Sequence, residues 1–335
     1  MTDQAYNSVN TTVRVLENEL LDRADFESLL QADGLREALV QLKKTRYAFD
    51  VDELEESKNF EAVLTNELAA GYQRLFDEVS DQRVINIFAL RYTYHNLKVL
   101  LKARFTKQNL SHLIIPIGSF KKKSLQNLVQ TGQSEHLPAV MVEGVVGAIE
   151  DYETYHRVQT ADVFMDTYYF KHLRKLSEEL NDERFTFLID TLIDLENMNT
   201  LLRSRRQEQS RSFMMTVLSS SGTITKTDLV NESDTGDVAD AIKLFEHKEY
   251  KDHLASIFSG DTSEYDPVKL ELLNDRVLHS FLETAVFEGF GPMPVLAYLF
   301  ALEMEVKNLR LILVGKNNGF SVDQIRERMH PIYVA

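Results

Sequence analysis

The chain has no cysteine, and it has little glycine or proline. The missing cysteines exclude disulfides, thiolate metal sites and cysteine nucleophiles. The 13 glycines and 6 prolines among 335 residues fall below the usual fractions of roughly 7 % and 5 %. Because so few residues interrupt helices over this length, the composition favours a helical fold.

Positive charge is also scarce, since 37 lysines and arginines stand against 52 aspartates and glutamates, a net charge of −15. A surface that binds nucleic acid needs cations to displace the counterions of the phosphates. The charge balance therefore argues against a nucleic-acid partner. Apolar residues make up 44 % of the chain, which is enough for a large core.

Long apolar runs are absent as well. The most lipid-like stretch, residues 295–302, has eight apolar residues and ends at Glu303, whereas a membrane span needs about 20. The first ten residues are polar and lack the basic start and apolar stretch of a signal peptide. We therefore expect a soluble, cytoplasmic polypeptide with no direct lipid span.

The apolar pattern is helical along most of the chain. Residues 60–76, 163–176 and 270–286 repeat apolar positions at the three-and-four spacing of one helical face. Two short stretches, 112–117 and 214–218, are candidates for extended structure. Residues 219–237, which are rich in Ser, Thr, Asp and Gly, are expected to be a loop or hinge, and residues 260–267 are another candidate loop. The sequence predicts an all-α fold.

Three segments of the chain resemble one another. Residues 96–104, 197–205 and 308–316 each read Asn, then Leu or Met, two variable positions, two large aliphatic residues, two more positions and a cation. A carboxylate (Glu67, Asp166 and Asp275) precedes the three asparagines by 29, 31 and 33 residues. The repetition predicts three helical units, 1–110, 111–210 and 211–335.

A further marker covers two of these units. Gly118 stands seven residues before Leu125, and Gly222 stands seven residues before Leu229. Three matches at near-equal spacing, with other markers in step, are hard to obtain by chance.

Motifs that bind nucleotides or metals are missing. Gly315-Lys316 is followed by Asn317, not by Ser or Thr, so it does not form a phosphate-binding loop. His247 and His253 are six residues apart, which does not place both on one helical face as zinc spacing requires. We expect no cofactor site and no metal site.

Two pairs of carboxylates lie close together in the sequence, but they are weak evidence for a catalytic site. Asp162 with Asp166, and Glu303 with Glu305, have the proximity that acid–base catalysis needs. Since the chain has 52 acidic residues, such pairs are expected on solvated helix faces. We expect no catalytic site.

The repeated asparagine helices allow two interpretations. In the first, each helix is the core stripe of its unit, and the asparagine caps a neighbouring backbone group. In the second, the three helices gather around a common axis, and their polar positions line a central recess that receives a partner. The candidate partner-binding residues are then Asn96, Lys98, Asn197, Arg203, Asn308 and Arg310. The basic clusters 121–123 and 203–206 are either solvated faces or docking patches for an acidic partner.

The same helices resemble a known family. Residues 302–316 and 323–328 resemble the C-terminal end of the C subunit of archaeal and bacterial V-type (A-type) ATPases, the counterpart of the eukaryotic d subunit. Residues 94–101 and 194–203 are similar to its other two repeat helices, and residues 42–47 to its Leu-x-x-Thr-x-Tyr segment. Asn199 departs from the pattern, because Lys98 and Arg310 occupy the equivalent positions.

The resemblance implies a non-catalytic rotor subunit, all-helical and funnel-shaped, built of three similar units about a common axis. It would sit on the cytoplasmic side of the membrane as a peripheral part of the complex. There it would link the central stalk, made by the D and F subunits, to the membrane rotor ring of proteolipid subunits. Its role would be to transmit the torque that couples ATP hydrolysis or synthesis to H⁺ or Na⁺ translocation.

Two other classes of function compete with this one. A cytoplasmic helical-repeat scaffold would bind a helical partner in a concave surface, although solenoid repeats are usually 20 to 50 residues long. An enzyme with an unrecognised all-helical active site would need a deep polar pocket with shifted carboxylates.

Overall fold

The computed structural model describes residues 3–235, 243–245, 251 and 267–333. His247, His253 and the predicted loop 260–267, except its last residue, lie outside the described residues.

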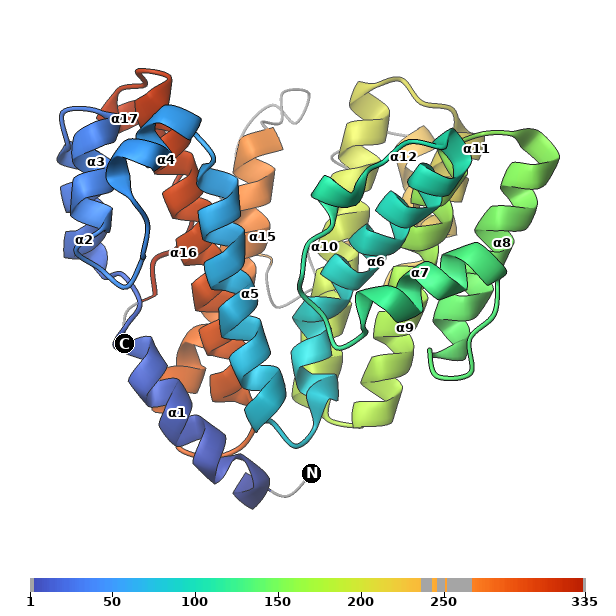
Figure 1. The fold of residues 1–335 in the computed structure, drawn as a ribbon. Helices are drawn as coiled ribbons and strands as arrows, with labels where there is room; N and C mark the ends of the chain where they lie inside the picture. The colour runs from blue at the N-terminus through green and yellow to red at the C-terminus, as the bar shows by residue number, and fades with distance from the viewer. Residues whose placement is uncertain (1–2, 236–242, 246–250, 252–266, 334–335) are drawn as a thin grey trace. The chain divides into compact units, whose positions relative to one another are not determined.

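Helices are the only regular secondary structure in these described parts of the chain (Figure 1). The prediction of an all-α fold is confirmed. The three periodic stretches lie in α5 (Phe60–Glu78), α9 (Thr160–Leu180) and α15 (Pro267–Leu282), the last of which continues into the 3₁₀ helix η3 (Glu283–Phe287).

Contacts divide the chain into two compact units, Met1–Ile85 with Glu271–Ala335, and Asn86–Leu270. The first is called unit 1 below and the second unit 2. Unit 1 thus joins the two ends of the chain. The predicted division into three units concerns sequence similarity and stays a prediction.

Unit 1 is built around α16 (Met293–Asn317), which contacts α1, α3, α5 and α17. Every residue of α16 from Met293 to Val306 is buried, and a largely apolar helix that is buried on all sides is typical of a protein core. The other helices of this unit are η1 (Asp3–Tyr6), α1 (Asn7–Glu17), α2 (Arg23–Gln31), α3 (Leu35–Leu42), α4 (Val51–Ser57) and α17 (Val322–Arg326).

The helices α5 and α16 lie side by side in Figure 1. A Cβ atom on Gly71 would lie only 2.3 Å from the Cδ2 atom of Leu302, so glycine permits their close approach. The Tyr72 hydroxyl donates a hydrogen bond of 2.5 Å to the carboxylate of Glu303. The buried Glu303 therefore has a structural partner at this contact.

Unit 2 contains most of α6 (Gln82–Thr106) and several later helices. The helices α8 and α9 pack closely because Gly144 and Gly147 face aromatic rings. A Cβ atom on either glycine would lie 2.7 Å or less from Tyr168 or Phe164. The remaining helices are η2 (Ser111–Leu113), α7 (Lys122–Thr131), α8 (Ala139–Tyr155), α10 (Glu183–Arg206), α11 (Arg211–Val217) and α12 (Lys226–Thr235).

One local prediction was wrong, and another was correct only in part. Residues 214–218 are not extended, because α11 covers 211–217 and the Ser210 side chain caps it by accepting from the backbone N–H of Phe213. Residues 219–225 form a loop as expected, but α12 then covers 226–235. The Thr225 hydroxyl stabilises the start of this helix by accepting from the backbone N–H of Asp228. In both places a Ser or Thr side chain caps the start of a helix that the sequence analysis did not predict.

The stretch 112–117 has no regular strand. It consists of the end of η2 followed by an extended segment from Ile114, whose φ is −73° and ψ is 126°. A proline in this stretch removes a backbone donor, which is unfavourable for a central strand.

The buried His172 of α9 makes the stability of the protein depend on pH. Its Nδ1 atom lies 3.2 Å from the Tyr94 hydroxyl, and burial together with the charge of Lys175 lowers its pKa from 6.5 to about 4. The fold therefore holds the neutral imidazole. Between these two pKa values the unfolded chain binds a proton that the folded chain does not, so stability falls as pH falls.

We predict that the His172→Gln variant is less sensitive to acid than the parent. Between pH 7 and pH 5 the parent should lose about 2 kcal/mol of unfolding free energy that the variant keeps, because only the parent titrates at this position. Urea unfolding of both proteins at the two pH values measures this. An equal difference in stability at pH 7 and pH 5 would contradict it.

Candidate partner-binding helices

The three repeated asparagines are buried, and each makes the same pair of hydrogen bonds. The Asn96 side chain in α6 donates to the backbone oxygen of Ile115 at 2.7 Å and accepts from the backbone N–H of Ile115 at 2.9 Å. A carboxamide carries one donor group and one acceptor, as a peptide unit does. Asn96 thus pairs with both backbone groups of a residue 19 positions later.

The other two copies repeat this geometry. Asn197 in α10 donates to the backbone oxygen of Ser219 at 2.9 Å and accepts from its N–H at 2.8 Å. Asn308 in α16 does the same with His330, at 3.2 and 2.8 Å. We call these three pairs the asparagine clamps. Each clamp fixes the segment that follows its long helix, and the interpretation of asparagine as a cap for a neighbouring backbone group is confirmed.

The position three residues before each asparagine takes part as well. In the first copy, a Cβ atom on Gly118 would lie 2.6 Å from the Thr93 hydroxyl oxygen. In the second, the Asp194 carboxylate accepts from the N–H of Thr223 at 2.8 Å, and a Cβ atom on Gly222 would lie 2.3 Å from that carboxylate. Glycine is thus required at these loops because a polar side chain of the long helix occupies the space.

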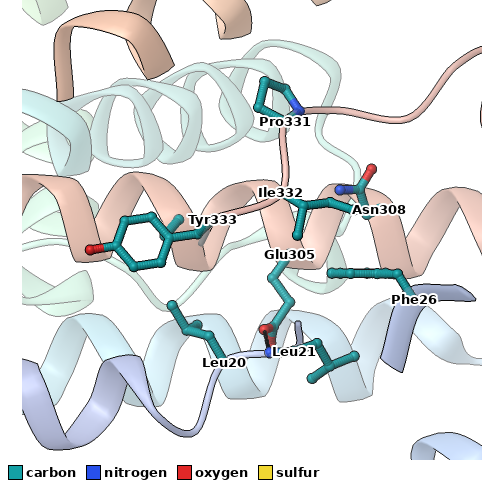
Figure 2. Close-up of a pocket in the computed structure, with 9 residues that line it drawn as sticks. Leu20, Leu21, Phe26, Glu305, Asn308, Pro331, Ile332 and Tyr333 are labelled. Carbon is teal, nitrogen blue, oxygen red and sulfur yellow. Dashed lines mark hydrogen bonds between the residues drawn. The ribbon is translucent and has the colours of Figure 1, made fainter. Parts of the chain in front are cut away.

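In the third copy the equivalent residue is Glu305, and its partner comes from the other end of the chain. Its carboxylate accepts from the backbone N–H of Leu21 at 2.6 Å, as Figure 2 shows. Leu21 lies just before α2, as Gly118 and Gly222 lie before α7 and α12. The C-terminal long helix therefore holds an N-terminal loop in place.

The buried Glu305 carboxylate is the centre of a polar network in unit 1. It also accepts from the Tyr47 hydroxyl at 2.7 Å and from the Arg46 guanidinium at 2.5 Å. Burial raises the pKa of Glu305 despite the opposing charge of Arg46. Burial and the Glu305 charge also raise the pKa of Tyr47, so this phenol stays protonated as a donor.

Beside this network the C-terminal segment covers α16. Leu20, Leu21, Phe26, Ala301, Glu305, Asn308, Pro331, Ile332 and Tyr333 enclose a cavity of about 10 Å³, and Figure 2 shows eight of them with labels. This is about the space of a single water molecule. The site is packed, and it holds two ends of the chain together.

A second polar network ties the same segment to α15. The Asp275 carboxylate lies 2.6 Å from Nδ1 of His330 and 2.8 Å from Nζ of Lys307. Burial alone would raise the pKa of Asp275, but the bond to His330 and the charge of Lys307 lower it below 3.8. The carboxylate that stands 33 residues before Asn308 in the sequence is thus a structural anchor.

The predicted cations are more accessible than the asparagines. Lys98 in α6 forms an ion pair with Asp166, and Arg310 in α16 binds both carboxylate oxygens of Glu61, at 2.7 and 2.8 Å. Solvent reaches both pairs, so each contributes about 1 kcal/mol or less to stability.

Arg203 of α10 is exposed. Desolvation and then the charge of Asp166 raise the pKa of Glu196, whereas Arg203, a hydrogen bond from Asn199 and Lys98 oppose that rise. Lys98 and Arg203, two of the six predicted residues, thus both lie in unit 2, and both act on the pKa of the same carboxyl group. Asn199 thus bonds a carboxylate, as do Lys98 and Arg310, the cations at the equivalent positions of the other two helices.

The carboxylate pairs of the sequence have structural partners. Asp162 pairs with Lys102 at 2.7 Å, next to the pair of Asp166 with Lys98.

The described residues contain no group of three or more His, Asp or Glu side chains that could hold a metal ion. No described helix has an apolar stretch long enough to cross a bilayer.

Comparison with known proteins places these helices in a family. The model of the ATP synthase (C/AC39) subunit family matches residues 9–328. The chain belongs to this family. It is 35 % identical to the C subunit of the V-type sodium ATPase of Enterococcus hirae over 98 % of this chain and 99 % of the relative.

More distant relatives carry a similar name. The chain is 24 % identical to the C subunit of the A-type ATP synthase of Methanocaldococcus jannaschii over 96 % of this chain and 85 % of that protein. It is 21 % identical to the protein of the same name from Pyrococcus abyssi, over 96 % and 89 %. The chain is therefore an ATPase subunit of the C type, an accessory subunit and not a catalytic one.

Sequence reasoning missed the residue three positions before each asparagine. Thr93, Asp194 and Glu305 all carry side-chain oxygens, and each faces or binds a loop of its own unit. A comparison of the three repeats at this position would have found the signal.

We predict that Asn197→Ala destabilises the protein by about 2–4 kcal/mol, since it leaves two buried backbone groups of Ser219 without partners. The control is Asn127→Ala on the exposed face of α7, which should change stability by about 0.5 kcal/mol or less. Urea unfolding of the two variants gives both values. An Asn197→Ala cost as small as that of the control would contradict the clamp.

Proposed function

We propose that the chain is the non-catalytic rotor subunit that links the central stalk, made by the D and F subunits, to the proteolipid rotor ring of a V-type ATPase. It transmits the torque that couples ATP hydrolysis or synthesis to H⁺ or Na⁺ translocation, from the cytoplasmic side of the membrane. The observation that carries this proposal is the family match across residues 9–328. Relatives named as C subunits, similar over nearly their whole length, support it.

The internal packing supports a mechanical role. A part that transmits torque must resist deformation, and closely packed helices supply stiffness. The asparagine clamps add fixed points, because each one holds the chain segment after a long helix with two buried hydrogen bonds. Sites for a nucleotide or a metal are not needed in such a part.

We further propose that the three asparagine helices are arranged about a common axis as a funnel that receives the stalk. Within that arrangement the amides of Asn96, Asn197 and Asn308 stabilise the helices from inside. Lys98, Arg203 and Arg310 are the members with access to solvent, so they are suited to contact an acidic surface of the stalk.

We predict that Lys98→Glu and Arg310→Glu each weaken binding to a purified D–F stalk by about tenfold, or about 1.4 kcal/mol, without unfolding the protein. The charge reversal places a like charge against the stalk. Titration of labelled D–F with each variant measures the affinity, and circular dichroism checks the fold.

Charge-swapped variants separate a direct contact from an internal ion pair. Lys98→Glu with Asp166→Lys, and Arg310→Glu with Glu61→Arg, restore the pairs seen in the structure. A direct contact keeps the swapped variants weak. Unchanged affinity in the single variants, or full recovery in the swapped ones, would remove these cations from the interface. Failure of the parent protein to bind any ATPase subunit would instead favour a helical-repeat scaffold.

A further inference from the structure

The connection between α15 and α16 exposes two phenylalanines at one end of unit 1. Phe287 is 90 % exposed and Phe290 65 % exposed, and these are the largest exposures of any phenylalanine among the described residues. A large apolar side chain left in water is costly, and exposed apolar patches mark interaction sites. We call these two residues the phenylalanine tip.

The two comparable connections are short and contain no aromatic residue. Three residues, 79–81, join α5 to α6, and two residues, 181–182, join α9 to α10. In each, an aspartate (Asp81 or Asp182) bonds an arginine two positions later. The α15–α16 connection spans 283–292 instead, so the extra residues and the two rings are particular to this end.

The backbone of the tip is held in place from α1. Arg14 donates to the backbone oxygens of Ala285 at 3.2 Å and Glu288 at 2.7 Å. Asn10 donates to the backbone oxygens of Gly289 at 3.4 Å and Gly291 at 3.0 Å. These four bonds fix the loop while both rings point into solvent. A preorganised pair of rings loses little conformational entropy on binding.

The charges around the tip favour a protein partner over a lipid surface. The sequence from 277 to 306 contains no lysine or arginine, and Glu283 and Glu288 flank Phe287. Arg14, the cation that bonds the backbone of the tip, has its charge paired with Glu17. An anchor in an anionic lipid surface depends on basic residues beside its apolar ones. The tip instead fits an apolar pocket whose rim is basic.

The phenylalanine tip comes just before the first residue of α16, far along that helix from Arg310, the cation proposed to contact the stalk. Arg310 lies 17 residues after Met293, the first residue of α16, which corresponds to about 25 Å of helix. On the proposed function, Arg310 contacts the stalk and the rotor ring is the remaining partner. We propose that Phe287 and Phe290 insert into an apolar, basic-rimmed pocket on the cytoplasmic side of the rotor ring.

The test compares the full chain with Phe287→Ala, Phe290→Ala and the double variant. Binding is measured to the detergent-purified ring, to the D–F stalk, and to vesicles that contain anionic lipid. We expect about tenfold weaker ring binding for each single variant and about a hundredfold for the double variant. Stalk binding and melting temperature should not change, because both rings lie outside the core.

Phe320→Ala is the matched control, since Phe320 is 45 % exposed and follows the other end of α16. It should leave ring binding unchanged. Ring affinity of the double variant equal to that of the parent would overturn the inference, as would an equal loss of stalk binding. Vesicle binding by the parent that the double variant loses would overturn it in favour of a lipid contact.

The same measurements distinguish this inference from the proposed function on which it rests. If the parent binds both stalk and ring and the double variant does too, only the phenylalanine tip is refuted. If the parent binds neither, the rotor function fails, and the tip as a ring contact fails with it.

Discussion

A buried asparagine that pairs with both backbone groups of one distant residue is the interaction on which this structure depends. After each of the long helices α6, α10 and α16, the chain turns back and passes along the surface of that helix. The backbone groups of the returning segment need hydrogen-bond partners there. Asn96, Asn197 and Asn308 supply a donor and an acceptor at one point. Because the three amides are buried, loss of any one leaves two backbone groups without water or a partner.

The closure of unit 1 follows from the same arrangement. In unit 2 the clamp and the residue three positions before it hold a loop that follows in the chain, as with Asp194 and Thr223. In unit 1 the clamp holds the C-terminal His330, whereas Glu305 holds the N-terminal Leu21. The first helices of the chain thus complete the surroundings of its last long helix. One buried helix thus fixes segments from both ends of the chain, which supports the proposed mechanical role.

Much of the fold was accessible from sequence because apolar periodicity depends on local spacing. The spacing predicted α5, α9 and α15, and the repeat located the three asparagines. Periodicity failed at α11 and α12, where Ser210 and Thr225 cap helices in segments that read as extended or loop. The bond from Leu21 to Glu305 could not be predicted from the sequence. In the first two repeats the loop follows its long helix in the chain, whereas in the third repeat it lies at the opposite end of the chain. The network of Glu305 with Arg46 and Tyr47 depends on that same long-range contact.

The family match makes this chain an accessory subunit, and its packing supports the mechanical role proposed for it. The stiffness of such a part depends on whether the clamps hold in solution. Amide hydrogen exchange at Ile115, Ser219 and His330 tests this directly, because each N–H donates to a buried asparagine oxygen. We predict exchange as slow as that of buried amides in the neighbouring long helices. Exchange at the rate of an exposed loop at these three residues would contradict the account.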